Sequence, residues 1–278
     1  MTRVMTTFSD FRVHALASGS SGNAMLVQGG STSVLIDAGL GVRSLSAMLA
    51  KRGVVDGRLD AILLTHEHTD HSIGAGPMSR RTQAPIVGNR ATLEVYAGRD
   101  ELSFASLELP TGGETAIGAF GIRSFPVPHD AVDAVGYVLE FGSTRFAYFT
   151  DAGSCTAPMR EALRGASFAV VEANHDLEWL KRGPYSPEMK HRVASPTGHL
   201  SNDDCADLIA ERLEEEGPMS IWLAHLSRVN NSVSLARRSV RERIVRRTSV
   251  PFYLDIALRD QPSVSWRSGA RGVQLSLL

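Results

Sequence analysis

The chain has 278 residues, of which 43% are hydrophobic, and a net charge of -1. This length and composition are typical of a soluble globular protein that buries its core without cross-links. Its two cysteines, Cys155 and Cys205, form no C-x-x-C pair, which argues against a cysteine-rich zinc site and favours a reducing compartment. No apolar run is long enough to span a membrane, and residues 1–12 lack the apolar segment of a signal peptide. We therefore expect a cytoplasmic protein without a membrane anchor.

Short apolar runs recur along the chain and predict strands. They fall at residues 11–16, 24–28, 31–36, 61–64, 86–87, 122–127, 135–141, 145–149, 168–171, 220–224 and 251–256. Longer stretches with helical periodicity predict helices at residues 43–52, 91–97, 158–163, 201–215 and 232–247. Two β-rich halves with outlying helices predict an α/β protein whose two sheets pack face to face, with helices outside.

No linker rich in Gly, Pro or Ser divides the chain, so we expect one domain over residues 11–260. Residues 1–10 are expected to form a flexible N-terminus. Residues 261–278 are polar and punctuated by glycine, which predicts a loosely packed C-terminal tail.

The predicted strand at residues 61–64 ends in the sequence THEHTDH. Four potential metal ligands fall within this segment: His66, His68, Asp70 and His71. Imidazole nitrogens and carboxylate oxygens suit zinc, manganese or iron. Two histidines separated by one residue can share one ion, while the adjacent Asp-His pair serves a second. A solvated turn would give no reason for an apolar strand to end in this pattern, so we predict a metal site.

Four ligands cannot complete two sites, and three further candidates each follow a predicted strand. His129 comes after residues 122–127, Asp151 after residues 145–149, and His225 after residues 220–224. Singly, each could be a capping aspartate or a half-buried histidine. As a set that recurs at strand ends, they favour a centre with two metal ions.

With these residues the chain resembles the metallo-β-lactamase superfamily, whose four-layer αββα sandwich carries two metals at one edge of its sheets. The resemblance implies two divalent ions, Zn²⁺ or Mn²⁺ and otherwise Fe²⁺. It implies a first site of His66, His68 and His129, a second site of Asp70, His71 and His225, and Asp151 as the bridge between both. It also implies that Asp37, after the strand at residues 31–36, supports the ligands from behind.

Further motifs narrow the resemblance. They are ASGSSGN at residues 17–23, VEANHD at 171–176, RGPY at 182–185, GHLSN at 198–202 and LAHLS at 223–227. Together they are similar to the bacterial YycJ/WalJ group over nearly the whole chain. That group is associated with 5′-to-3′ exonuclease activity on double-stranded DNA. The resemblance therefore implies a metal-dependent phosphodiester hydrolase that acts in DNA repair or replication.

Residues for catalysis are implied by the same resemblance. Glu172 and His199 resemble the acid and histidine pair of the related ribonuclease Z group, in which the histidine is placed to protonate the leaving oxygen. With Asp70, they are the catalytic candidates. His175 could support this cleft from behind. Equally, it could be a loop histidine whose hydrogen bonds are all made within the protein.

Contacts to the DNA backbone can be sought in two segments. The loop that holds Ser20, Ser21 and Asn23 could present N–H groups to a phosphate, although a tight turn between strands explains it as well. The arginine-rich segment that begins at Arg228 offers a second set, with the remaining candidates on its predicted helix: Arg237, Arg238 and Arg241. A solvated helix face, paired in part with the acidic residues at 203–216, is the alternative. Without a sequence-reading motif, DNA would be recognised by shape and ends.

Two other classes of function stay open, other hydrolases and a non-enzyme. A ribonuclease Z-like RNA nuclease, a cyclic phosphodiesterase or a thioesterase would use the same metal centre. A non-catalytic binding module on a degenerate fold would not need it, and the complete ligand set speaks against this reading because buried, unpaired His and Asp clusters are costly. The sequence predicts no particular oligomeric state.

Overall fold

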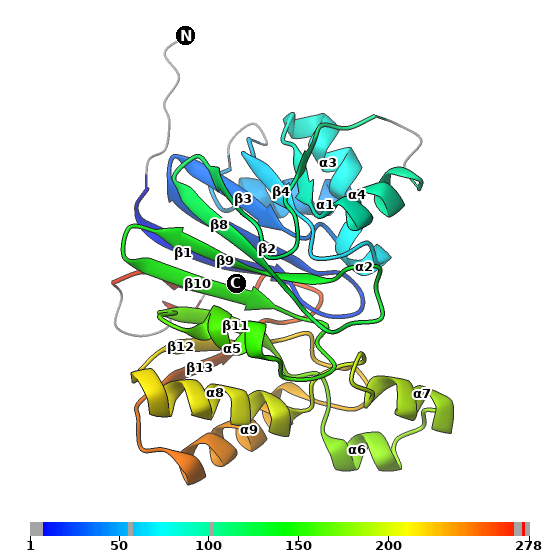
Figure 1. Cartoon of the computed structure of the whole chain (residues 1–278), viewed down its shortest axis with the longest axis vertical. Helices are drawn as coiled ribbons and strands as arrows, with labels where there is room; N and C mark the ends of the chain where they lie inside the picture. Colours follow the sequence, from blue (N-terminus) through cyan, green and yellow to red (C-terminus); the bar gives the residue numbers. More distant parts are fainter. Residues whose placement is uncertain (1–7, 55–57, 100–102, 270–273, 276–278) are drawn as a thin grey trace.

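The computed structural model describes residues 8–54, 58–99, 103–269 and 274–275. They form two β-sheets that pack face to face, with helices on both outer faces (Figure 1). The predicted four-layer αββα sandwich of the metallo-β-lactamase fold is confirmed. Within these residues no helix combines the length and apolarity that crossing a membrane requires.

The first sheet has eight strands within the described residues. In spatial order they are β15 (Gln274–Leu275), β14 (Val264–Arg267), β1 (Phe8–Ala17), β2 (Ala24–Gly30), β3 (Thr32–Ile36), β4 (Ala61–Leu63), β5 (Ile86–Gly88) and β6 (Ser106–Glu108). The pairs from β15 to β3 are antiparallel, whereas β3, β4, β5 and β6 run parallel. The carboxyl ends of β3 and β4 therefore meet at one edge.

The second sheet has seven strands within the described residues. In spatial order they are β13 (Tyr253–Ile256), β12 (Ser220–Ala224), β11 (Phe168–Glu172), β10 (Thr144–Phe149), β9 (Val135–Phe141), β8 (Phe120–Pro126) and β7 (Glu114–Ile117). Strands β10 to β13 run parallel, and the others pair antiparallel. Their parallel order again gathers several strand ends at one edge.

The helices cover the outer faces of the sheets (Figure 1). Those near the first sheet are α1 (Val42–Ala50), α2 (Thr69–Ser72), α3 (Ala75–Thr82) and α4 (Arg90–Ala97). Those near the second sheet are α5 (Ala157–Leu163), α6 (Leu177–Arg182), α7 (Pro187–Val193), α8 (Asn202–Glu216) and α9 (Val233–Arg247). Leu45 of α1 packs on the outer side of the first sheet, and Val240 of α9 on that of the second. A third apolar layer, with Phe146 and Trp222, fills the space between the sheets.

The chain ends differ in part from the expectation. Residues 1–7 of the expected flexible N-terminus lie outside the described residues, and Phe8 already begins β1. The expected loose tail contains β14, which pairs with β1, and Trp266 of β14 stacks on Phe168 with ring centroids 4.8 Å apart. Val264 and Trp266 are two residues apart and face the core together, which a polar tail would not do. Helices α6 and α7 were also not predicted.

Candidate metal centre

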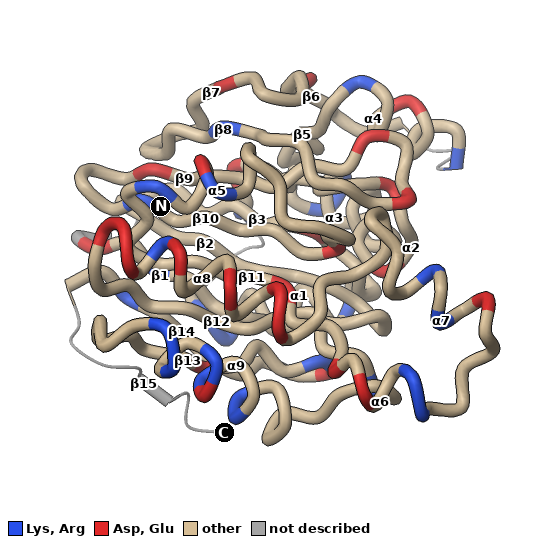
Figure 2. The backbone as a smooth tube through the Cα atoms, turned by 60° about the horizontal axis from the view of Figure 1, so that its bottom comes forward, with Lys and Arg blue, Asp and Glu red and all other residues tan. Residues whose placement is uncertain are grey.

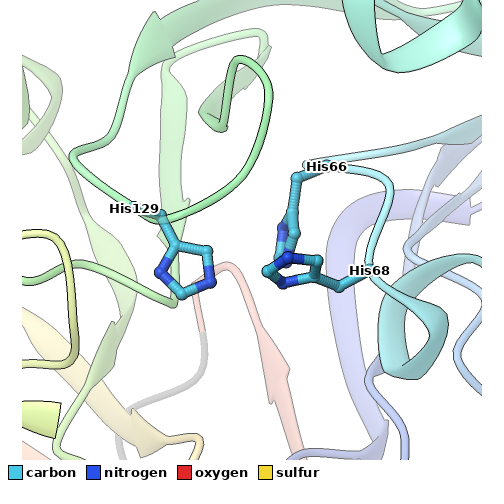
Figure 3. Close-up of side chains that lie close together, drawn as sticks. All are labelled: His66, His68 and His129. Atoms are coloured by element: carbon cyan, nitrogen blue, oxygen red, sulfur yellow. The ribbon is translucent and has the colours of Figure 1, made fainter. Parts of the chain in front are cut away.

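The histidines of the THEHTDH segment lie at the edge where the strands end. His66 and His68 follow β4, and His129 follows β8 in the opposite sheet. Figure 3 shows the three imidazoles turned toward one another across this edge. Each offers one nitrogen, and the three nitrogens lie within 4.8 Å of one another. The geometry of the expected first set is therefore present.

The expected second set converges in the same way. One atom each of Asp70, His71 and His225 lies within 4.8 Å of the others. Asp151 lies between the sets, with Oδ2 at 3.1 Å from His71 Nε2 and Oδ1 at 3.9 Å from His129 Nε2. This position between both groups is the one expected of a bridging carboxylate.

Three residues at this edge have left-handed backbone conformations. Asp37 (φ 59°), Asp151 (φ 57°) and His225 (φ 55°) each lie just beyond a strand. For a residue with a Cβ atom this conformation costs about 1 kcal/mol or more. Such strain persists only where surrounding contacts impose it, and it is typical of functional sites.

Asp37 holds His71 from behind. Its Oδ2 accepts a hydrogen bond from His71 Nδ1 at 2.8 Å, and its Oδ1 accepts one from the Thr65 backbone N–H at 2.9 Å. Because Asp37 engages Nδ1, Nε2 is the His71 nitrogen that faces the centre. The supporting position expected for Asp37 is thus occupied as the resemblance implied.

The donor atoms fit divalent cations. Among the described residues, His66 Nε2 and His225 Nε2 are buried without a hydrogen-bond partner, and Asp70 Oδ2 lies 3.9 Å from His225 Nε2, too far for a hydrogen bond. Buried polar atoms are seldom left in this state. A metal ion is the partner that accepts nitrogen lone pairs in this arrangement.

The charges of the centre also favour the binding of divalent cations. Burial alone would lower the pKa of His225, but Asp151, Asp70 and Glu172 together raise it to about 10. Asp37 and Asp151 likewise hold the pKa of His71 well above its usual value despite its burial. The carboxylates therefore attract positive charge, which divalent ions supply when they replace the protons.

Glu172 connects the second set to His199. Its Oε1 accepts hydrogen bonds from His199 Nδ1 at 2.8 Å and from His225 Nδ1 at 2.9 Å. Its Oε2 accepts one from the backbone N–H of Ala152 at 2.8 Å. Burial would raise the pKa of Glu172, but the two imidazoles lower it to about 2, so the carboxylate stays ionised. One buried carboxylate thus orients two imidazoles.

Two other sequence candidates are buried, which was not expected of Asn23. Asn23 is fully buried, with Oδ1 bound to the Gly19 backbone N–H at 2.8 Å and Nδ2 at 2.9 Å from His71 Nε2. It therefore braces the loop from inside, and its expected contact with a surface phosphate is wrong. His175 is also buried, and its backbone forms a bridge with Ser201. Burial lowers the pKa of His175, and its neighbours Glu172 and His199 modify that shift.

The arginines of α9 are largely engaged within the protein. Arg237 Nη2 donates to Asp255 at 2.6 Å, and the Arg241 guanidinium lies 5.1 Å from the centre of the Phe252 ring. Arg238 is exposed. Further along the helix, Arg243 binds Asp207 of α8 at 2.7 Å. Figure 2 shows acidic positions on α8 and basic positions on α9. Intramolecular pairing, the alternative to DNA contacts, therefore explains much of this arginine-rich segment.

Sequence reasoning missed one buried acid in the histidine segment. Glu67 is only 6% exposed, and its carboxylate accepts a hydrogen bond from the Val132 backbone N–H at 3.2 Å. It thereby fixes the loop that begins at His129. Its place between His66 and His68 was the only signal for it in the sequence.

Comparison with known proteins agrees with this geometry. A β-lactamase superfamily domain matches residues 32–217. The chain belongs to the metallo-β-lactamase superfamily, the class that the sandwich and the strand-end cluster define.

The expected similarity to the YycJ/WalJ group is also confirmed. The chain is 34% identical over 235 residues to exodeoxyribonuclease WalJ of Streptococcus pneumoniae, which covers 83% of this chain and 87% of that protein. It is 35% identical over 231 residues to exodeoxyribonuclease YycJ of Bacillus anthracis, with 81% and 86% covered. The crystal structure of the metallo-β-lactamase fold protein YhfI from Bacillus subtilis shares the fold, with a TM-score of 0.69, 19% identity and coverage of 93% and 100%.

Proposed function

We propose that the chain is a metal-dependent exodeoxyribonuclease that hydrolyses double-stranded DNA from 5′ to 3′. The observation that carries the proposal is the convergence of seven His and Asp side chains from both sheets at one edge, where two buried imidazole nitrogens have no hydrogen-bond partner in the described part of the chain. The exodeoxyribonuclease relatives, which match more than four-fifths of this chain, support DNA as the substrate.

The residues are assigned to two divalent ions, zinc, manganese or iron. One set consists of His66, His68 and His129, the other of Asp70, His71 and His225, with Asp151 shared. When bound, such a pair of ions activates water and neutralises the charge that develops on the phosphate. Asp70 is assigned to the second set as a ligand and, through it, to catalysis.

His199 is assigned the proton that the leaving 3′-oxygen needs. Glu172 accepts the Nδ1 hydrogen bond at 2.8 Å, so Nε2 is the atom left to give a proton. Despite burial, the ionised Glu172 and Asp151 raise the pKa of His199 above its usual value, which favours the protonated imidazole. A protonated, oriented imidazole is suited to act as a general acid.

The proposed substrate also defines the macromolecule that the protein binds. Duplex DNA would be bound through its backbone, as in DNA repair or replication in the cytoplasm. The contacts of Arg237, Arg238 and Arg241 with DNA stay a prediction, because Arg237 and Arg241 would have to exchange their present neighbours, Asp255 and Phe252, for phosphates. No other class of substrate is favoured by a feature of the site.

The test is a nuclease assay with purified protein and either Mn²⁺ or Zn²⁺. We expect mononucleotides to be released from the 5′ end of end-labelled duplex DNA, with no release in excess EDTA. Single-stranded DNA and RNA of the same sequence, together with bis(p-nitrophenyl) phosphate, serve as comparison substrates. Cleavage of RNA without cleavage of DNA would replace the proposal by the ribonuclease alternative. Hydrolysis of the chromogenic ester alone would point to a small phosphodiester as the substrate.

A further inference from the structure

The loop at residues 18–23 is anchored to the second ligand set. Ser18 Oγ accepts a hydrogen bond from the His225 backbone N–H at 2.9 Å. At its other end, the Asn23 backbone N–H donates to the Asp70 carbonyl oxygen at 2.8 Å. Both anchors are backbone contacts to proposed ligands, so the loop cannot shift independently of the centre. Its exposed tip, Ser20 and Ser21, is thereby held beside the site.

Two donors meet on one carboxylate at this tip. Ser21 Oγ donates to Asp260 Oδ1 at 2.5 Å, and Arg228 Nη2 donates to Asp260 Oδ2 at 3.2 Å. The two donors come from different segments, and the Arg228 and Asp260 side chains are 70% and 59% exposed. A hydroxyl and a guanidinium that converge on two oxygens form an anion site, and here the chain itself supplies the anion.

A second guanidinium lies next to this group. Arg259 Nη2 donates to the carbonyl oxygen of Leu226 at 2.9 Å, one residue beyond His225. Its side chain packs so tightly on Gly19 that a Cβ atom there would lie 2.9 Å from Arg259 Cγ. Among the described residues, Arg259 Nε is buried without a hydrogen-bond partner. Arg259 is thus fixed in place against the loop, and any contact with a phosphate would be made by the outer end of its guanidinium, since Nε is enclosed by protein.

The charges of this group do not cancel. Burial and the neighbouring Arg228 guanidinium lower the pKa of Arg259, whereas Asp260 and Tyr185 act in the opposite direction. Arg259 makes no ion pair with Asp260, which is bound by Arg228, but both guanidiniums lie close enough to this single carboxylate to feel its charge, so positive charge exceeds negative charge in the group. An exposed ion pair such as that of Arg228 with Asp260 is weak, so its carboxylate can be exchanged for another anion.

We propose that Ser21, Arg228 and Arg259 form a phosphate subsite for the DNA backbone, in which Asp260 occupies the anion position until substrate displaces it. A phosphodiester group offers the same oxygens as the carboxylate and binds guanidinium groups in the same way. The subsite rests on the proposed function, since it would hold a phosphate next to the bond that is cut.

The test exploits a difference in sign. If Asp260 competes with the substrate, D260N lowers the KM for duplex DNA about threefold, whereas R228Q and R259Q each raise it about tenfold or more, the effect of removing one charged hydrogen bond. R228Q and R259Q also make the dependence of log kcat/KM on log salt shallower, by about 0.9 for each phosphate that the variant no longer neutralises. R164Q is the matched control, because it removes a paired arginine at the end of α5. We expect it to leave KM unchanged.

A purely structural ion pair gives a different pattern. If Asp260 and Arg228 only hold the loop, D260N and R228Q both raise KM, and the subsite is overturned. R259K keeps the charge and should recover part of the loss in R259Q, while thermal unfolding of each variant shows that it is folded. Equal KM values for wild type, R228Q and R259Q would also overturn the subsite, with the nuclease function intact. A wild-type protein that does not cut duplex DNA would overturn the proposed function and this subsite with it.

Discussion

Two regions of the molecule are highly charged: the edge where the strands end, and the outer face formed by α8 and α9. They differ in whether their polar side-chain atoms have partners within the protein. On the α8–α9 face, Arg243 binds Asp207 at 2.7 Å and Arg247 binds Glu214 at 2.9 Å, and these ion pairs are partly exposed to solvent. At the edge, His66 and His225 each keep a buried nitrogen without a protein partner among the described residues. Charges that neighbours satisfy serve structure, whereas polar atoms that the fold leaves unsatisfied indicate where a ligand belongs.

The largest effect is expected at the edge, from D151A. Asp151 lies within reach of His71, His129 and His225, so its removal takes away the carboxylate shared by both proposed ions. We expect nuclease activity to fall below detection and metal content to drop below two ions per chain, as measured by elemental analysis. D176A, which alters an aspartate at the start of α6, is the control. Two ions retained with near wild-type turnover would remove Asp151 from the centre.

A smaller loss is expected when a side chain beside the ions is removed. H199A should keep both ions and lose turnover by about 10²-fold to 10⁴-fold, the contribution of one proton transfer. Glu172 and Asp151 raise the pKa of His199, so the protonated general acid is favoured, and wild-type kcat should fall as pH rises through that pKa. This alkaline decline should be absent in H199A.

The matched control for that variant is H191A, which removes an exposed histidine of α7. It should match wild type in turnover and in pH profile. Loss of metal from H199A would make His199 a ligand and contradict its assigned role.

A still smaller effect is expected from the arginines at the start of α9. Arg237 and Arg241 already have intramolecular partners, and Arg238 is exposed. The triple variant R237A/R238A/R241A should therefore make the log-log salt slope of duplex binding shallower by no more than about 0.9, the value for one neutralised phosphate. A change near three times that value would place all three arginines on DNA. The α8–α9 face would then bind ligand as well, and it would no longer differ from the edge in this respect.

The smallest effect is expected on stability, from D207N. The hydrogen bond from Arg243 holds the pKa of Asp207 below its ordinary value. A lowered folded-state pKa adds stability above the unfolded-state pKa, near 3.9, and that stability is lost as pH falls through the folded-state pKa. Urea unfolding should show D207N less stable than wild type by about 0.5–1 kcal/mol at pH 7 and nearly equal near pH 2. A pH-independent difference would show that the ion pair is not its source.

The convergence of the candidate ligands could be predicted from the sequence because each segment that carries them follows an apolar run. His66, Asp151 and His225 all lie just past strands whose ends the sandwich gathers at one edge. Local pattern and fold class together were sufficient there. The position of Asp37 behind His71 was implied by the family resemblance.

Other features depend on contacts between distant segments, which a local pattern does not contain. Strand β14 is stabilised by pairing with β1, where Arg267 lies opposite Arg12. Arg259 gains its position from packing on Gly19, and Arg243 finds its acidic partner on α8. Helices α6 and α7 are short and each buries a single residue, Leu180 and Val193, so neither shows an apolar helical period.

The unsatisfied edge is, in this proposal, the place where two metal ions bind. Anomalous diffraction from crystals of the protein grown with Mn²⁺ or Zn²⁺ tests this most directly. We predict two peaks, one among His66, His68 and His129 and the other among Asp70, His71 and His225, with Asp151 in contact with both. An edge without bound metal at saturating concentration, or peaks held by other residues, would contradict the proposal.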